Sequence, residues 1–288
     1  MSKLTNTFVN QSLFGTESPV ALITGSGVAR VGRCVAEYFR DHGFHVVLHA
    51  NRSVEVAEQL VAKWNSECQS SPAGPLASPR PASLVTGDVS DEAQVRKWRS
   101  EIDARYGRLD VLVNSAAIWE PIPLEKTTAA DFEHFFRINA LGTALTNQQF
   151  GLMMTQQQHG GAIINIGDWA TARPYRDFSA YFPSKASVVS ITQSMAVELA
   201  TRNPKVRVNA ILPGPVLLAE EVSEQRRERI IRECLLQREG RPDDVAAAAV
   251  FLATSPFITG VCLPVDGGRS IYAGPSADPI AHPKVADE

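Results

Sequence analysis

The chain has 288 residues, of which 44% are hydrophobic and 20% are charged, an ordinary composition for a globular protein with a sizeable core. Its 28 lysines and arginines face 31 acidic residues, a net charge of −3, so no strong basic field is available to hold nucleic acid or an anionic membrane. The four cysteines are far apart, which disfavours a metal site or a disulfide framework and favours a reducing cytoplasm. No apolar run reaches the roughly 18 to 20 residues that span a bilayer. We therefore expect a cytoplasmic protein whose partner is a small molecule.

Strand-like and helix-like patterns alternate along most of the chain. Short runs rich in Val, Ile and Leu are typical of strands covered on both faces. Between them, residues such as Val31, Val35 and Phe39 recur four apart on one helix face. This alternation predicts a single α/β domain with a parallel sheet and helices on both faces. The predicted strands are Val20–Thr24, His45–His49, Ser83–Thr86, Leu109–Val113, Ala162–Ile166, Val206–Ile211 and Gly260–Val265.

Three segments fall outside this alternation. Residues 1–18 are polar and mixed, without the apolar core of a signal peptide, and predict a flexible N-terminal arm. Residues 69–82 are rich in proline, which ends helices and is excluded from central strands, so we expect a surface insertion there. Residues 273–288 predict a C-terminal tail. The folded domain is therefore expected over residues 19–272.

A glycine-rich turn follows the first predicted strand. Gly25, Gly27 and Gly32 separate this strand from the next helix, an arrangement in which backbone N–H groups approach a pyrophosphate and the helix N-terminus favours its charge. The spacing is not GxGxxG, so a tight turn without a ligand is the alternative.

The end of the second strand, residues 49–53, carries no acidic residue, whereas an Asp or Glu there binds the ribose 2′-hydroxyl of NAD. Arg52, with Ser53 beside it, is suited to charge-assisted hydrogen bonds with a 2′-phosphate, and Arg30 or Arg33 would help. This pattern predicts NADP(H) as cofactor. The alternative is an arginine that is simply solvated.

Tyr181 and Lys185 lie four residues apart, so on a helix they share one face. An ammonium group near a phenol favours the phenolate and lowers the tyrosine pKa, which suits proton transfer. Because such a pair is frequent by chance, it argues little alone.

Taken in order, these motifs resemble those of the short-chain dehydrogenase/reductase family, from about Pro19 to Tyr272. The resemblance implies a doubly wound Rossmann-type fold with a seven-stranded parallel sheet, and a homotetramer or homodimer. It implies Tyr181 as proton donor, Lys185 as binder of the nicotinamide ribose, and Asn139 as holder of a water leading toward Lys185. The motifs that carry it are TGSGVARVG, Asp88, NSAA at 114–117, Asn139, YFPSK at 181–185, Pro213-Gly214 and Asp266-Gly267-Gly268.

The same resemblance implies where the cofactor lies, with Asp88 at the adenine and Asn114 along its length. The residues expected to bind NADP(H) are Gly25, Arg30, Val31, Gly32, His49, Asn51, Arg52, Ser53, Asp88, Val89, Asn114, Ala116, Tyr181, Lys185, Pro213, Gly214 and Val216.

Asp168 stands thirteen residues before Tyr181, where most of the family carries a catalytic serine. In this feature, in Arg30 and in the HANRS stretch, the chain is similar to pteridine reductases. An aspartate paired with Tyr181 would relay a proton to the nitrogen of a dihydropterin C=N bond, provided that burial or hydrogen bonding raises its pKa. Alternatively, Asp168 only caps a turn, and a neighbour such as Thr171 supplies the hydroxyl.

Trp119 stands where pteridine reductases carry an aromatic residue that stacks on the pterin, an interaction of about 0.5–1.5 kcal/mol beyond area burial. A loop anchor or interface residue is the alternative. The residues expected to bind substrate are Arg30, Trp119, Asp168, Tyr175 and Tyr181.

Residues 213–240 correspond to the substrate loop of the family. The charged run 224–229 predicts a solvated helix face, and the alternative is that Arg226 or Arg229 grips an anionic substrate tail.

The sequence thus predicts an NADPH-dependent oxidoreductase that transfers hydride to an unsaturated small molecule, with a pterin or dihydropterin as preferred substrate class. Its expected catalytic residues are Tyr181, Lys185, Asp168 and Asn139. One alternative is an NADPH-dependent carbonyl reductase acting on a 3-oxoacyl thioester or another ketone. Another is a non-enzymatic NADP(H)-binding sensor, which the presence of both Tyr181 and Lys185 disfavours.

Overall fold

The computed structural model describes residues 3–70, 80–218 and 222–272. Seven parallel strands form one sheet in the order β3-β2-β1-β4-β5-β6-β7, which confirms the predicted doubly wound α/β fold. The winding reverses between β1 and β4, and the crevice at the carboxyl ends of such strands is where ligands bind in open α/β sheets. The strands are β1 Val20–Thr24, β2 His45–Ala50, β3 Ser83–Thr86, β4 Val111–Asn114, β5 Gly161–Ile166, β6 Val206–Pro213 and β7 Cys262–Val265.

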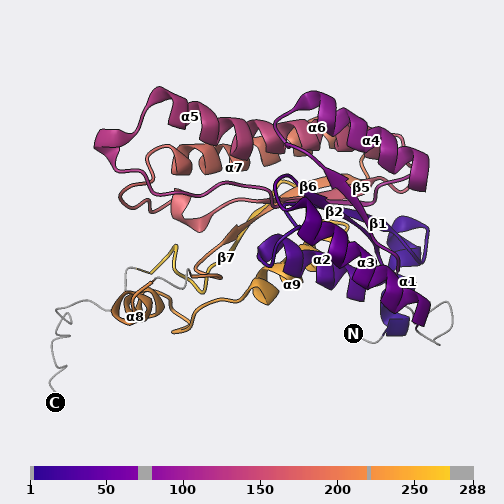
Figure 1. Cartoon of the computed structure of the whole chain (residues 1–288). Coiled ribbons are helices and arrows are strands. Elements are labelled where there is room, and N and C mark those ends of the chain that lie inside the picture. The colour runs from indigo at the N-terminus through magenta and orange to yellow at the C-terminus, as the bar shows by residue number, and fades with distance from the viewer. Residues whose placement is uncertain (1–2, 71–79, 219–221, 273–288) are drawn as a thin grey trace, which may run out of the picture.

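Helices cover both faces of the sheet (Figure 1), and none in the described ranges is long and apolar enough to cross a membrane. The α-helices are α1 Lys3–Phe14, α2 Val31–Asp41, α3 Val54–Ser70, α4 Glu92–Tyr106, α5 Ala129–Phe135, α6 Gly142–Thr155, α7 Tyr181–Ala200, α8 Glu224–Arg232 and α9 Pro242–Thr254. Short 3-10 turns η1 Leu124–Lys126 and η3 Trp169–Thr171 and the π-helical turn η2 Phe136–Leu141 complete the set.

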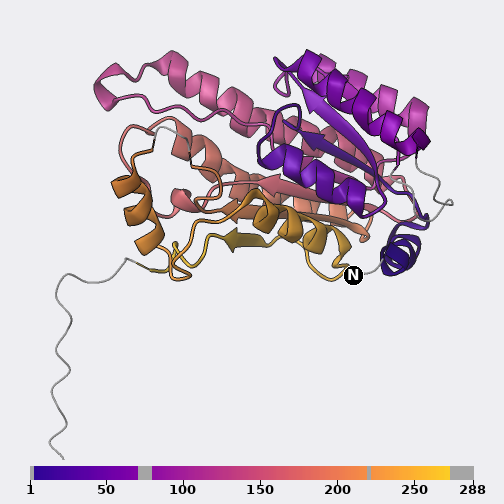
Figure 2. The ribbon, with the colours of Figure 1, turned by 60° about the horizontal axis from the view of Figure 1, so that its bottom comes forward.

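Two hydrophobic layers hold the helices to the sheet, because successive strand residues point to opposite faces. Ile23 of β1 faces the layer that contains Phe39 of α2 and side chains of α3 and α9. Its neighbour Leu22 faces the other layer, which contains Trp98 of α4 and side chains of α6 and α7. Figures 1 and 2 show the same two groups of helices on either side of the strands. Packed side chains therefore cover both faces of the sheet, and this packing supports the loops at its carboxyl edge.

The expectation of a flexible arm over residues 1–18 is wrong for its larger part, because residues 3–14 form α1. Phe14 is only 3% exposed and packs edge-on against Phe44, with ring centroids 5.7 Å apart. The Asn10 amide donates to the carbonyl of His42 at 2.9 Å, and Arg108 donates to the carbonyl of Phe14 at 2.6 Å. These long-range contacts fix a segment whose own composition carries little signal.

Smaller differences concern segment ends. The insertion expected over 69–82 begins later, because Gln69 and Ser70 still belong to α3, and at its other end Ala82 is buried and bonded to the Asn65 side chain. Residues 71–79 and the tail expected over 273–288 lie outside the described residues. β4 starts two residues after the predicted Leu109, and β6 runs on to Pro213.

Candidate active site

The glycine turn after β1 is packed so closely that it has no room for side chains. Gly25 has φ +67°, and a Cβ placed there would lie 2.7 Å from Cα of Ala116. A Cβ on Gly32 would lie 2.6 Å from the carbonyl oxygen of Gly25. Arg30, the N-cap of α2, makes no side-chain capping hydrogen bond, so the N–H groups of the first helical turn lack a capping partner from it. The turn therefore brings bare backbone to a helix N-terminus, as a phosphate site requires.

His49 braces this turn from inside the protein. Its Nδ1 accepts from the Gly25 N–H at 3.0 Å, and its Nε2 lies 2.9 Å from the carbonyl of Gly87. Burial lowers the pKa of His49 to about 4, so the ring is neutral at pH 7 and the two contacts assign Nδ1 as acceptor and Nε2 as donor. Arg33 similarly donates to the carbonyls of Ser26 and Gly27. Both side chains therefore hold the turn in shape. Because the Arg33 guanidinium is bonded to these carbonyls, it is not free to bind a 2′-phosphate.

The residues predicted to select the cofactor lie at the end of β2. Asn51 and Arg52 are exposed and Ser53 is half-buried. Arg30, across the mouth of the glycine turn, is exposed as well. Within the described ranges no hydrogen bond or ion pair engages the guanidinium of Arg30 or of Arg52. The guanidinium groups of Arg30 and Arg52 are therefore available to bind an anion such as a phosphate.

Other residues predicted to bind the cofactor are engaged in hydrogen bonds within the protein. Asp88 accepts from the backbone and the hydroxyl of Ser90, both at 2.8 Å. Asn114 is buried, donates to Asn165 at 2.9 Å and accepts from Thr146 at 2.8 Å. The remaining members of the predicted set near these loops are half-buried or buried, namely Val31, Val89, Ala116, Pro213, Gly214 and Val216.

The predicted proton donor Tyr181 meets Asp168 at the start of α7. Tyr181 is the first residue of that helix, and its hydroxyl donates to Oδ2 of Asp168 at 2.7 Å. The other carboxylate oxygen accepts from the backbone N–H of Ala170 at 2.7 Å, so Asp168 caps η3. One oxygen of Asp168 therefore caps the turn, and the other is bonded to the phenol to which a relay would pass a proton. The hydroxyl of Thr171 is committed to the Asp168 carbonyl at 2.9 Å.

The electrostatics of the pair favour protonated groups. Burial raises the pKa of Asp168 against the opposing effects of its hydrogen bonds and of Lys185. Burial and the nearby Asp168 charge raise the pKa of Tyr181 well above its ordinary value. The direction is opposite to the sequence-based expectation that the Tyr181 pKa is lowered, because burial, and after it the carboxylate bonded to the phenol, disfavours the phenolate. Tyr181 is therefore a phenol, not a phenolate, at neutral pH.

Lys185 and Asn139 are tied into the backbone nearby. Lys185 is 5% exposed and donates to the Ile166 carbonyl at 2.6 Å, and burial lowers its pKa to about 8. Asn139, in the π-helical turn, donates to the Ile118 carbonyl and accepts from the Ile118 N–H. It also donates to the Ser184 hydroxyl at 3.0 Å. Such π-turns are frequent at functional sites, and here the turn aims Asn139 at both the loop after β4 and α7.

Aromatic side chains surround the pair. Trp119 is 52% exposed and stacks on Phe178 with centroids 5.0 Å apart, and Tyr175 packs edge-on against the same ring. Phe178 and Phe135 each contact the ring of Tyr181. The structure thus gathers the predicted substrate residues Trp119, Tyr175, Asp168 and Tyr181 in one place. Arg30 lies at the glycine turn instead.

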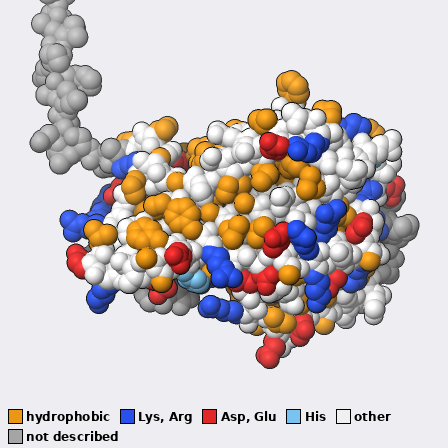
Figure 3. All heavy atoms as spheres, turned by 90° about the horizontal axis from the view of Figure 1, so that it is seen from above, with side chains coloured by type: hydrophobic (Ala, Val, Ile, Leu, Met, Phe, Trp, Pro, Cys, Tyr) orange, Lys and Arg blue, Asp and Glu red, His pale blue; other side chains and the backbone are white. Residues whose placement is uncertain are grey.

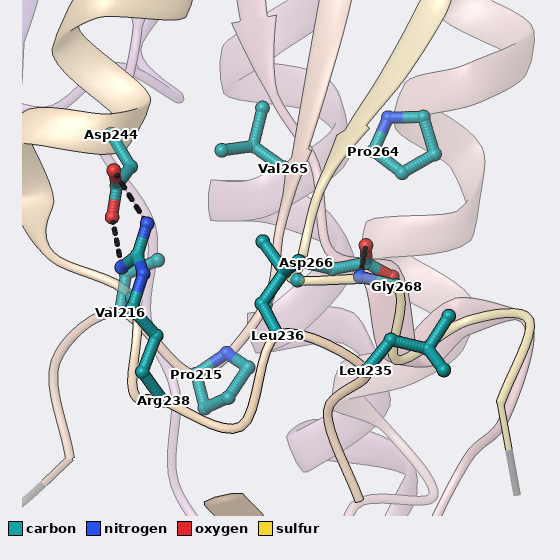
Figure 4. A pocket seen from close by; sticks show the side chains of 13 residues that line it. Pro215, Val216, Leu235, Leu236, Arg238, Asp244, Pro264, Val265, Asp266 and Gly268 are labelled. Carbon is teal, nitrogen blue, oxygen red and sulfur yellow. Dashed lines mark hydrogen bonds and ion pairs between the residues drawn. The ribbon is translucent and has the colours of Figure 1, made fainter.

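The segment after β6 lies beside this site. Its helix α8 has no buried residue, and Arg226 and Arg229 are exposed, as a solvated face predicts. A cavity of about 370 Å³ opens where the segment meets β7, with Leu235 and Leu236 opposite Pro264 and Val265 (Figure 4). Tyr181 and Asp168 are not among its lining residues, so this hollow is not the centre of the proton chemistry.

Two residues next to the site went unnoticed in the sequence. Ser184 links Asn139 to α7 and donates to the Tyr181 carbonyl at 2.6 Å; its place inside YFPSK was a usable signal. Arg269 lies over the ring of Trp169 at 4.7 Å, and no local pattern distinguishes it from a solvated arginine.

The sequence of this chain is similar to those of known oxidoreductases. Residues 27–270 match the family model described as Enoyl-(Acyl carrier protein) reductase. The chain belongs to the short-chain dehydrogenase/reductase family. It is 31% identical over 255 residues to carbonyl reductase family member 4 of Xenopus laevis, covering 88% of this chain and 99% of that protein. It is 30% identical over 259 residues to the 3-oxoacyl-(acyl-carrier-protein) reductase of Thermotoga maritima, covering 88% and 99%.

Solved structures agree with this membership. A gluconate 5-dehydrogenase from Burkholderia cenocepacia, in complex with NADP and tartrate, has a TM-score of 0.77 and 28% identity, covering 88% of this chain and 95% of that one. The predictions of the family and of an oxidoreductase are confirmed. The finer expectation of closeness to pteridine reductases is not shown, and the relatives act on carbonyl or alcohol groups according to their names.

Proposed function

We propose that this chain is an NADP(H)-dependent reductase of a small-molecule carbonyl compound, with Tyr181 as its proton donor. The observation that carries the reductase part of the proposal is the 2.7 Å hydrogen bond between Tyr181 and Asp168, with Lys185 buried one helical turn away. The names of the relatives favour carbonyl chemistry over the pterin chemistry that the sequence first indicated. The carbonyl alternative from the sequence is therefore the better supported one.

The residues at the carboxyl edge fit a nicotinamide dinucleotide phosphate. The glycine turn offers close backbone and a helix start without a side-chain cap, which suits a pyrophosphate. Arg52 and Ser53 would hold the 2′-phosphate, and the absence of an acidic side chain at residues 49–53 removes the usual partner of a free 2′-hydroxyl. The bound cofactor supplies the hydride. The gluconate 5-dehydrogenase complex with NADP supports this choice.

The protein's own part is the control of one proton. While Asp168 is ionised, it accepts the hydrogen bond of Tyr181 and holds that proton away from a substrate. Once protonated, Asp168 donates to the phenol oxygen and leaves the Tyr181 O–H for the carbonyl oxygen. Because burial raises the pKa of both groups, the protonated arrangement is favoured more than for ordinary side chains. A protonated donor suits reduction, whereas oxidation needs a base.

A dihydropterin is the second candidate substrate. Two observations favour it: a carboxyl group in place of a catalytic serine, and the exposed face of Trp119 beside the pair. A planar heterocycle would stack on that face.

The proposal is tested by following NADPH consumption with a 3-oxoacyl thioester, a sugar-derived ketone and a 7,8-dihydropterin as acceptors. We expect turnover with a ketone, NADPH bound more tightly than NADH, and no turnover in Tyr181→Phe although it binds NADPH as the wild type does. Turnover with the dihydropterin alone would replace the substrate class. Tight NADPH binding without turnover on any acceptor would favour the sensor alternative.

We also propose that the chain forms a homodimer or homotetramer, as the family resemblance implies. Hydrophobic side chains gather on the face above α5, η2, α6 and α7 (Figure 3). The exposed large apolar residues of these elements are Phe132, Phe136, Leu141, Leu152 and Val197. Contiguous apolar surface of this kind is typical of interfaces, and light scattering in solution would show the state directly.

A further inference from the structure

The helix α8 is attached to the rest of the protein by few contacts. It stands off the sheet beyond the end of β7 (Figure 1), and none of its residues is buried. One ion pair, Arg227 with Glu239, stays within the same segment. Hydrophobic burial therefore holds α8 weakly, and polar contacts to neighbouring segments decide its position.

Arg269 provides the strongest of these contacts. Its side chain is only 10% exposed, and it donates to the Ile230 carbonyl of α8 at 2.9 Å and to the carboxylate of Glu233, the residue that caps α8. The same guanidinium lies 4.7 Å from the ring centroid of Trp169. Trp169 follows Asp168 directly, and Asp168 caps the turn that Trp169 begins. One side chain thus touches both α8 and the turn that carries the proton-transfer carboxyl.

Hydrogen bonds and one close contact hold the backbone around Arg269 in place. Asp266 accepts from the N–H groups of Gly268 and Ser270 at 2.9 and 2.6 Å. Figure 4 shows the Asp266–Gly268 bond next to Leu235, and a Cβ on Gly268 would lie 2.7 Å from that leucine. From the other side, Arg173 donates to the Arg269 carbonyl at 2.9 Å. These contacts fix the backbone of Arg269, from which its side chain extends to α8.

We propose that Arg269 is a positioning residue that holds α8 against the Asp168-bearing turn, so that the substrate loop and the proton donor keep one geometry during reduction. This inference rests on the proposed reductase function. Arg269 acts through Trp169 and α8 and does not contact the reacting atoms. A planar guanidinium is required, because Lys would pair with Glu233 but would not also stack on Trp169 and reach the Ile230 carbonyl.

The test compares Arg269→Met and Arg269→Lys with the wild type in kinetics, NADPH binding and limited trypsin digestion. Hydrogen bonds to charged groups are the strong ones in proteins, so we expect Arg269→Met to raise KM for the carbonyl substrate about tenfold or more. The dissociation constant of NADPH should stay unchanged, and Arg269→Lys should restore part of the loss. Trypsin should cut faster after Arg226, Arg227, Arg229 and Arg232, the four arginines of α8.

Arg229→Met is the matched control. Arg229 also approaches Glu233, at 3.8 Å, but its side chain is 68% exposed, so its loss should leave both KM and the cleavage of the remaining α8 arginines near the wild-type values. Unchanged cleavage within α8 of Arg269→Met would overturn the proposed attachment. Faster cleavage with unchanged KM, or an equal loss of NADPH binding, would overturn the positioning role. A wild type that reduces no acceptor would refute the reductase function itself, a result distinct from any of these.

Discussion

At the scale of single residues, the proposed reductase mechanism depends on the hydrogen bond between Asp168 and Tyr181. A serine at this place donates whatever the pH, whereas a carboxyl group donates only when it is protonated. Burial raises the pKa of Asp168, which brings its titration closer to neutral pH than for an exposed aspartate. In the proposed mechanism, Asp168 therefore accepts a hydrogen bond from Tyr181 at high pH and donates one to it at low pH, while the phenol stays protonated.

Replacing Asp168 with asparagine tests this control. The wild-type kcat/KM for reduction should be full below the raised pKa of Asp168 and fall as pH rises through it, because the ionised carboxylate then accepts the Tyr181 proton. Asp168→Asn, whose amide donates at every pH, should lack that decline, with a change of about 10²-fold or less at the optimum. Kinetics across the neutral range measure it, with Thr171→Ala as control. An unchanged pH profile in Asp168→Asn would assign the titration to another group.

At the scale of elements, the turn between β1 and α2 depends on glycine for two separable reasons. Gly25 needs both its positive φ and its close approach to Ala116, whereas Gly107, the C-cap of α4, has φ +66° with no atom within 4 Å of an added Cβ.

Gly25→Ala should therefore lose stability and NADPH binding together, since the turn must move to avoid the contact. Gly107→Ala should lose only the backbone term, on the order of 1–2 kcal/mol, and should bind NADPH normally. Denaturant unfolding and NADPH titration of the two variants measure the difference. Equal losses of NADPH affinity would show that packing at Gly25 does not shape the site.

Local patterns account for what the sequence predicted at this scale. The strands are predictable because buried parallel strands are short unbroken apolar runs. Helical spacing puts Tyr181 and Lys185 on one face, and the family resemblance implies their roles. The family resemblance points to Asp168, which stands in the place of the usual serine, but which atoms its two oxygens bind depends on the turn η3. No local pattern predicts the role of Arg269, because its hydrogen-bond partners Ile230 and Glu233 lie 39 and 36 residues away in sequence and only the fold brings them together.

At the scale of the whole molecule, α1 closes the end of the sheet opposite the site. Its contacts reach the loop after α2 through Asn10 and the start of β4 through Arg108. Arg108 also pairs with the buried Asp110, which accepts from the N–H of Val20 at 2.8 Å. The N-terminal helix is thus joined to the first strand of the domain, and the predicted boundary at residue 19 divides a continuous packing unit.

Phe14→Ala should therefore destabilise the whole fold and not only loosen a terminus. Removing a buried phenylalanine lowers the free energy of unfolding by about 3–5 kcal/mol, and Phe14 belongs to the core layer that contains Phe39 and Phe44. Phe8, on the same helix but 76% exposed, is the matched control and should change stability by less than about 0.5 kcal/mol. Urea unfolding measures both. If the two variants unfold alike, α1 is an appendage; if Phe14→Ala alone shifts the single cooperative transition, the helix belongs to the domain that carries the active site.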